Sequence, residues 1–170
     1  MTDISLCVFL GNPGREYVHS RHNAGFMLAG LHRSTRNASW QEKFHGQYAE
    51  VLDGGRKIHL LKPQTFMNKS GISVAAAASF FKVDVRGDLV VHDELELPFG
   101  TVGYRLGGGL GGHNGLRSVA ERLGSKDFAR LRIGIGRPRG GSVSSYVLSQ
   151  FNSDEKAVLE RVLHAAADMF

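Results

Sequence analysis

Residues 4–14 of the chain read ISLCVFLGNPG, and this segment decides the class of fold. Seven mostly apolar residues come first, far short of the roughly 18 that a membrane-spanning helix needs. No basic residue precedes them, so the run does not have the form of a secretory signal. A short apolar run closed by Gly11-Asn12-Pro13-Gly14 is typical of a buried strand that ends in a turn.

Further strands and helices alternate along the chain. Apolar runs predict strands at 47–52, 57–61, 88–92, 101–106 and 131–135, and Asp53-Gly54-Gly55 predicts a hairpin between the first two. After Arg21-His22-Asn23 the sequence predicts a helical stretch that contains Phe26, Met27, Gly30 and Leu31. Helical spacing also predicts helices over 71–82, over 116–123, and from Ser153, the expected cap, to 166. Residues 33–45 have no clear pattern, and 63–70 read as a loop. This order predicts an α/β fold, a single domain over 1–170 with a mixed, mostly parallel twisted sheet flanked by helices.

The composition is that of an ordinary folded protein. With 42% hydrophobic and 22% charged residues in 170, the chain can bury a core and is not disordered. Cys7 is the single cysteine, which excludes an internal disulfide and fits a reducing cytoplasm. Its place in an apolar run favours a core thiol over a nucleophile.

Basic residues gather in one part of the chain, within a net charge of +5. Residues 101–140 hold two acids, Glu121 and Asp127, against eight basic side chains: Arg105, Arg117, Arg122, Lys126, Arg130, Arg132, Arg137 and Arg139. Such a segment favours a polyanionic partner such as nucleic acid, although a solvated basic face without a partner has the same composition.

Polar residues recur at predicted strand ends and turns, where α/β folds place their sites. They are Asn12, His22-Asn23, Asn68, and Asp93 with His113-Asn114. Each has an ordinary explanation when taken singly: asparagines form turns or cap helices, and His22 can simply end a helix. Taken together, these residue types are what a hydrolytic site needs.

The chemistry of such a set is direct. A histidine near neutral pKa takes a proton from water, and a carboxylate on its other nitrogen fixes the tautomer and stabilises the imidazolium. Asparagine amides donate to a developing oxyanion. Asp93, at the end of a strand, is the natural orienting carboxylate, and no Gly-x-Ser-x-Gly elbow suggests a serine nucleophile.

Two other kinds of site have weaker support. Gly107, Gly109 and Gly112 match the dinucleotide pattern G-x-G-x-x-G, but no acid ends a strand about 20 residues later. These glycines also suit a close backbone approach to substrate or a mobile gate. A metal could use His92, Asp93, Glu94 and His113, yet no H-E-x-x-H or paired-cysteine spacing is present.

The same clusters resemble the signatures of bacterial-type peptidyl-tRNA hydrolases. Five blocks occur in the family's order between residues 4 and about 151. They are LGNPG at 10–14 with Tyr17 and RHNAG at 21–25; TFMN at 65–68 with Ser70-Gly71; HDEL at 92–95 with Leu97-Pro98 and Gly100; GGG at 107–109 with GGHNGL at 111–116; and RLRIGIGRP at 130–138. Five ordered blocks are far more specific than any one motif.

The resemblance implies a metal-free, cofactor-free monomer that hydrolyses the ester between a peptide and the 3′-terminal ribose of tRNA. It implies that His22 is the base that activates water and that Asp93 is its partner. The other implied positions are Asn12, Tyr17, Met67, Asn68, His113 and Asn114 around the substrate, and Arg105 and Arg132 on tRNA phosphates. The main alternative is an RNA-binding module that keeps the fold without turnover, and retention of the implied catalytic positions argues against it.

Some positions depart from the family pattern. Phe9, Ser20, Glu96 and Phe99 replace a common glycine, threonine, aspartate and proline, respectively. Gly103 stands where a basic residue is frequent, and the sequence stops at Phe170 where relatives often continue with a basic tail. We therefore expect a reduced tRNA footprint and an unaltered catalytic set.

Overall fold

The first predicted strand lies in the middle of the sheet. In the computed structural model, which describes residues 3–168, β1 (Leu6–Phe9) pairs in parallel with β4 (Arg56–Pro63) on one side and with β5 (Asp88–Glu94) on the other. Every residue of β1 and β5 is buried, because helices cover both faces of these strands.

The sheet has seven strands in the order β2-β3-β4-β1-β5-β7-β6. The strands not yet described are β2 (Gln41–Lys43), β3 (Gly46–Asp53), β6 (Val102–Leu106) and β7 (Ala129–Gly134). The four central strands, β4, β1, β5 and β7, run parallel, and antiparallel pairs occur at both edges. The predicted mixed α/β sheet is confirmed, including the hairpin of β3 and β4, in which Gly54 and Gly55 form the turn with positive φ.

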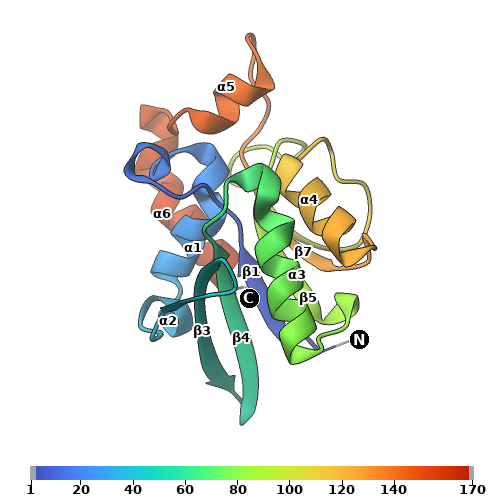
Figure 1. Cartoon of the computed structure of the whole chain (residues 1–170). Helices are drawn as coiled ribbons and strands as arrows, with labels where there is room; N and C mark the ends of the chain where they lie inside the picture. The colour runs from blue at the N-terminus through green and yellow to red at the C-terminus, as the bar shows by residue number, and fades with distance from the viewer. Residues whose placement is uncertain (1–2, 169–170) are drawn as a thin grey trace.

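Helices cover both faces of the sheet (Figure 1). On one face lie α1 (Ala24–Leu31) and α6 (Ser153–Asp168), and on the other lie α3 (Ser70–Phe81) and α4 (Asn114–Leu123). Alternate residues of β1 enter the two cores: Phe9 packs with α1 and α6, and Val8 packs with α3 and α4.

Short segments complete the chain. They are η1 (Arg15–Tyr17), η2 (Arg21–Asn23), α2 (Arg33–Arg36), η3 (Met67–Lys69), η4 (Val85–Gly87) and α5 (Val143–Leu148). Sequence patterning did not predict α2, β2, η3 or α5, which are too short to show a period. Within the described residues, no helix is both long and apolar enough to cross a membrane.

The cap of α6 is one residue earlier than the sequence predicts. Ser153 is the first helical residue, and Asn152 is the cap: its Oδ1 accepts from the backbone N–H of Glu155 at 2.8 Å. The carboxylate of Glu155 accepts in return from the N–H of Asn152 at 2.9 Å. This reciprocal capping box satisfies two donors that helix formation leaves free.

The loops that carry the candidate residues meet at one edge of the sheet. Asn12 follows β1, Met67 and Asn68 follow β4, and Asp93 lies near the end of β5. The parallel strands all end at this edge, which is where α/β folds bind ligands.

Candidate active site

A buried carboxylate lies at the centre of the site. Asp93 is 1% exposed, and its Oδ2 accepts a hydrogen bond from Nδ1 of His22 at 2.8 Å. Its Oδ1 accepts from Nε2 of His113, also at 2.8 Å. The two imidazole rings lie 4.9 Å apart between centroids. The structure therefore brings together three residues that are far apart in sequence and that the sequence analysis selected.

His22 is held in place by the residue before it. The guanidinium of Arg21 is buried and lies 4.1 Å from the ring centroid of Tyr146. It also donates to Ser149 and, at 3.0 Å, to the carboxylate of Glu155. These contacts join η2 to α5 and α6, so His22 is on a rigid segment despite its place in a connecting region.

His113 has a defined tautomer. Its Nδ1 accepts from the backbone N–H of Leu116 at 3.2 Å, so its proton lies on Nε2 and is donated to Asp93. His113 is thus the cap of α4, and the alternative that Asn114 caps this helix is wrong. Asn114 is instead the first helical residue and is exposed.

The charges in this group favour an ionised Asp93 and a basic His22. Burial alone would lower the pKa of His22, but the charge of Asp93 and the hydrogen bond to it raise this pKa above its ordinary value. Burial would raise the pKa of Asp93, and the two histidines more than offset it, so the pKa of Asp93 is lowered. The remaining nitrogen of His22, Nε2, has no hydrogen-bond partner among residues 3–168 and is free to accept a proton.

Asn12 presents an amide group whose direction is set by the backbone. Its Oδ1 accepts from the N–H of Met67 at 2.7 Å, and the side chain of Asn23 bonds to both backbone groups of Asn12, at 2.8 and 3.0 Å. The Nδ2 of Asn12 makes no hydrogen bond within the described part of the chain and remains a donor. Asn23 is a supporting residue to which sequence analysis assigned no separate role.

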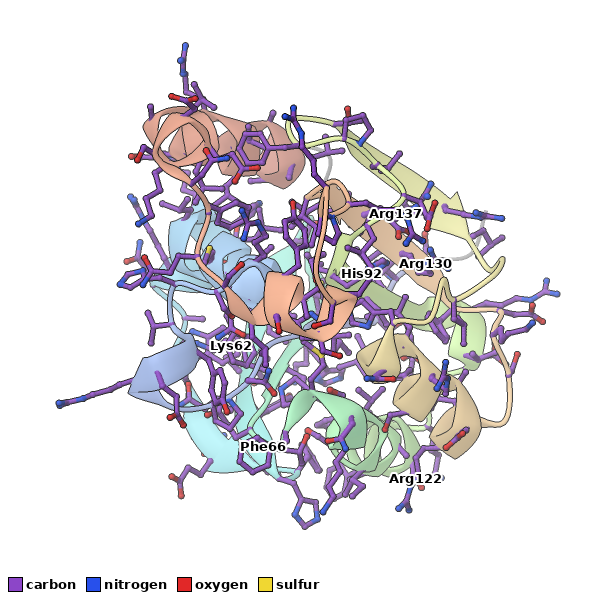
Figure 2. The ribbon with its side chains drawn as sticks, turned by 90° about the horizontal axis from the view of Figure 1, so that it is seen from above. Lys62, Phe66, His92, Arg122, Arg130 and Arg137 are labelled. Atoms are coloured by element: carbon purple, nitrogen blue, oxygen red, sulfur yellow. The ribbon has the colours of Figure 1, made fainter. Side chains whose placement is uncertain are left out.

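Two cavities divide the candidate residues between them. His22, Asp93, His113 and Asn114 line a cavity of about 270 Å³ together with Val143, Ser144 and Val147 on or beside α5. Asn12 borders a neighbouring cavity of about 380 Å³ with Asn23 and Lys62. Figure 2 views the molecule from above and labels Lys62 and His92. The helix α5, which the sequence did not predict, forms part of the wall of the cavity that His22 lines.

Three other expected residues lie outside both linings. Asn68 is exposed on η3 beside Phe66, which is also exposed. Met67 is buried beneath the start of α4, where a Cβ on Gly115 would overlap its sulfur atom. Tyr17 is half-buried on η1.

The two expected phosphate contacts lie on neighbouring edge strands. Arg105 is exposed on β6, and Arg132 on β7 donates through Nε to the Oε1 of Glu94 at 2.9 Å. Arg130, opposite Arg105 in the register of β6 and β7, donates to the same oxygen at 3.2 Å. Sequence analysis considered Glu94 only as a possible metal ligand and did not predict its bonds to Arg130 and Arg132.

Comparisons with known proteins agree with this geometry. Residues 6–170 match the profile of the family described as peptidyl-tRNA hydrolase. The chain belongs to the peptidyl-tRNA hydrolase family. A peptidyl-tRNA hydrolase of Treponema pallidum is 50% identical over 98% of this chain and 85% of its own length. One from Oleidesulfovibrio alaskensis is 46% identical over 96% and 86%.

A solved structure shows the same fold. The crystal structure of peptidyl-tRNA hydrolase from Acinetobacter baumannii is 38% identical, with a TM-score of 0.88 over 99% of this chain and 85% of that one. The family predicted from the five sequence blocks is therefore confirmed, and with it the expectation of a hydrolase.

One group of side chains in the described part of the chain has the spacing of a possible metal site. Across residues 3–168, one group of potential ligands brings its atoms together, those of His22, Asp93 and His113 within 4.8 Å of one another. The full set weighed from sequence is not assembled. The ring of His92 lies 5.3 Å from that of His113 between centroids, but its Nδ1 donates to the carbonyl of Asp93 at 2.7 Å. In the assembled group, hydrogen bonds already join the histidines to Asp93, and a metal ion would have to displace their protons.

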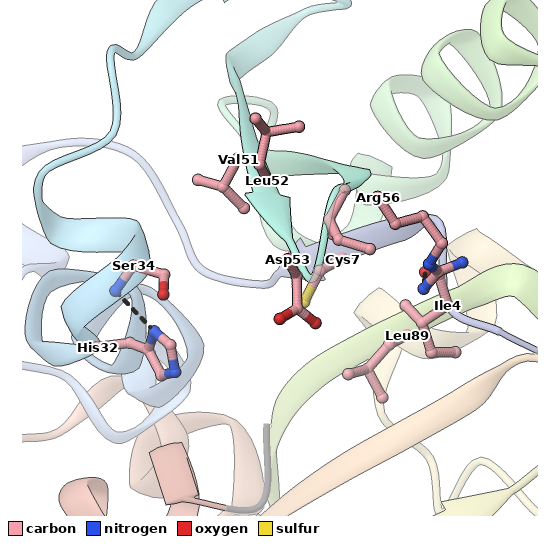
Figure 3. Close-up of a pocket in the computed structure, with 10 residues that line it drawn as sticks. Ile4, Cys7, His32, Ser34, Val51, Leu52, Asp53, Arg56 and Leu89 are labelled. Carbon is pink, nitrogen blue, oxygen red and sulfur yellow. Dashed lines mark hydrogen bonds between the residues drawn. The ribbon is translucent and has the colours of Figure 1, made fainter.

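Neither the glycine motif nor Cys7 forms another site. The strand before the glycine motif, β6, runs antiparallel to β7, so it does not belong to the βαβ unit that a dinucleotide fingerprint requires. Cys7 is 1% exposed and burial raises the pKa of its thiol well above the ordinary value, as expected of a core residue. It borders a cavity of about 290 Å³ at the opposite end of the sheet (Figure 3).

Proposed function

We propose that this protein hydrolyses the ester between the peptide and the 3′-terminal ribose of peptidyl-tRNA, using water activated by His22 and no metal. The observation that carries the proposal is the pairing of His22 with buried Asp93, which leaves one imidazole nitrogen free at a cavity. An ester needs less activation than an amide, so an imidazole base suffices.

The reaction begins with a water molecule bound near His22. Nε2 of His22 takes a proton as the water oxygen attacks the ester carbonyl, and Asp93 stabilises the imidazolium that forms. Collapse of the tetrahedral intermediate breaks the bond to the ribose oxygen, which receives the proton back from His22. The products are a free 3′-hydroxyl on tRNA and a peptide carboxylic acid, which loses its proton to solvent and leaves as the carboxylate.

The surrounding amides position the substrate. The free Nδ2 of Asn12 donates to the peptide or to the developing oxyanion, and Asn114 holds the peptide part and the attacking water. Asn68 contributes a second exposed amide on η3. His113 keeps Asp93 ionised and oriented through its own hydrogen bond, and Met67 and Tyr17 shape the surrounding surface.

The tRNA approaches over the basic edge of the sheet. Arg105 and Arg132 contact its phosphates, and the exposed ring of Phe66 beside Asn68 offers a flat surface to a terminal base. The protein acts as a monomer in the cytoplasm, as the resemblance implies. Sedimentation analysis of the purified protein tests the monomeric state.

Release of an N-blocked amino acid from aminoacyl-tRNA tests the proposal, with and without EDTA. Release that persists in EDTA supports it. Release that chelation abolishes would move the chemistry to a metal held by His22, Asp93 and His113. Binding of tRNA without release would make the protein an RNA-binding module and overturn the proposal.

A further inference from the structure

The glycine-rich segment 107–112 joins β6 to α4 and leads directly into His113 and Asn114. Gly107, Gly108, Gly111 and Gly112 all have positive φ, a backbone region that few other residues adopt. A segment of this kind has few side chains to pack and many accessible backbone conformations. Its position must therefore be set by groups outside it.

Arg130 supplies the side-chain part of those contacts, beside a backbone bond from the N–H of Gly107 to the carbonyl of Phe128 at 3.0 Å. It is 1% exposed on β7, and its Nη1 donates to the carbonyl of Gly109 at 2.6 Å and to that of Gly107 at 3.5 Å. Its Nη2 donates to Glu94 at 3.2 Å. Figure 2 labels Arg130 and His92, which lie on the neighbouring parallel strands β7 and β5. A planar guanidinium can bond to the loop and the carboxylate at once.

Glu94 connects this guanidinium to the catalytic strand. It is the residue after Asp93 on β5, it lines the cavity that contains His22, and its Oε2 accepts from the N–H of Glu96 at 3.3 Å. The path from Gly109 through Arg130 and Glu94 thus ends beside the carboxylate that holds His22 and His113.

We propose that Arg130 is a positioning residue for ester hydrolysis, which holds the glycine-rich segment against β5 so that His113 and Asn114 reach Asp93 and the substrate. This inference rests on the proposed function. Arg130 is too deeply buried to contact tRNA itself, so its role is distinct from that of Arg105 and Arg132.

The variant Arg130→Lys tests the inference. An ammonium keeps the charge but lacks the fork that reaches Gly109 and Glu94 together. We expect kcat to fall by about tenfold or more, since small misplacements of catalytic groups are costly, with KM for peptidyl-tRNA changed by less than about threefold. Arg56→Lys is the matched control: its guanidinium also donates to a backbone carbonyl, that of Ile4 at 2.6 Å, but at the other end of the sheet.

Hydrogen–deuterium exchange supplies a readout that does not depend on turnover. In Arg130→Lys, amides of 107–113 should exchange faster while those of β1 and α3 keep their protection. Glu94→Gln, which removes charge with little change in volume, should give the same local effect if the lysine variant folds poorly.

Three outcomes would overturn the inference. They are an unchanged kcat, exchange in 107–113 equal to that of the wild type, and faster exchange spread evenly over the sheet, which would indicate a general stabilising role. If the wild type itself releases no peptide, the proposed function fails and the hydrolytic role of Arg130 fails with it. Exchange then still decides whether Arg130 holds the segment.

Discussion

At the scale of single residues, the role proposed for His22 predicts a specific loss. His22→Ala should lower kcat/KM by about 10²–10⁴-fold, the usual worth of a general base. The fold should survive because Asp93 keeps its hydrogen bond to His113. Turnover of N-blocked aminoacyl-tRNA measures the loss, and exposed His19→Ala is the control. Near-normal turnover in His22→Ala would contradict the proposed base.

The role proposed for Asp93 predicts that its substitution changes the pH dependence of kcat/KM as well as its magnitude. His22 accepts a proton only when neutral, so the wild-type rate should fall as pH drops through its raised pKa. Asp93→Asn removes the charge that raises this pKa and leaves the burial that lowers it. We expect a lower plateau and an acid limb shifted to lower pH in kcat/KM profiles, with KM less affected. An unshifted limb would show that Asp93 does not control His22.

The buried carboxyl group of Asp88, far from the site, should make the stability of the fold depend on pH. Burial, and secondarily the charge of Asp84, raises the pKa of Asp88 to about 8, and neither carboxyl oxygen has a hydrogen-bond partner among residues 3–168. The folded state therefore retains a proton that the unfolded chain releases near pH 4. Stability from this group is full below about pH 4 and is lost as pH rises to about 8.

Urea unfolding of Asp88→Asn and wild type at several pH values between 4 and 9 measures this effect. The variant should be relatively more stable at the alkaline end, because its amide carries no charge to bury. Asp53→Asn at the exposed hairpin is the control. Parallel pH profiles for Asp88→Asn and the wild type would contradict the interpretation.

At the scale of elements, the contact between α3 and the middle of α4 fixes where α4 lies. The N–H of Gly71 donates to Oγ of Ser118 at 2.9 Å, and a Cβ on Gly71 would overlap the carbonyl oxygen of Ser118. Gly71→Ala should therefore destabilise the fold by about 1–3 kcal/mol, the usual cost of overpacking. It should also lower kcat, since α4 carries His113 and Asn114.

Gly30→Ala is the matched control for that substitution. Gly30 is an exposed residue of α1, and a Cβ there meets no atom within 4 Å among the described residues. Alanine should stabilise this helix by about 0.5–1 kcal/mol. Thermal unfolding measures the change in stability of both variants. Equal changes in Gly71→Ala and Gly30→Ala would show that α3 and α4 can move apart without cost.

At the scale of the whole molecule, the basic segment is less uniform than its sequence suggests. Arg130 is buried. Arg132 and Arg137 pair with Glu94 and Glu96, whereas the exposed side chains of Arg105, Arg117, Arg122, Lys126 and Arg139 have no carboxylate partner among residues 3–168. A buried cation cannot reach a phosphate, so Arg130 adds nothing to the counterion release that accompanies phosphate binding. The tRNA footprint is therefore smaller than eight basic residues would allow.

Salt dependence measures this footprint. The logarithm of tRNA affinity should fall linearly with the logarithm of salt concentration, and Arg105→Gln should reduce the slope by about one. Arg56→Gln, at the far end of the sheet, should leave the slope unchanged. A flat profile for the wild type would indicate that binding does not depend on the basic edge.

The sequence by itself determined the elements whose patterns are local. The apolar run at 4–10, the Asp53-Gly54-Gly55 turn and the spacing of Leu116, Val119 and Leu123 predict β1, the hairpin and α4, because each signal lies within one element. The same holds for the family, whose five blocks are read directly from the chain.

Only the tertiary structure decided how these parts make a site. His22 and Asp93 are 71 residues apart, so no local pattern predicts their hydrogen bond. The chemistry of the residue types suggested Asp93 as the partner of a histidine, and the resemblance named His22. The cap of α4, the wall formed by α5 and the contacts of Arg130 with Glu94 and Gly109 were missed for the same reason. A side-chain contact across the fold depends on how strands and helices pack, and packing is a property of the whole chain.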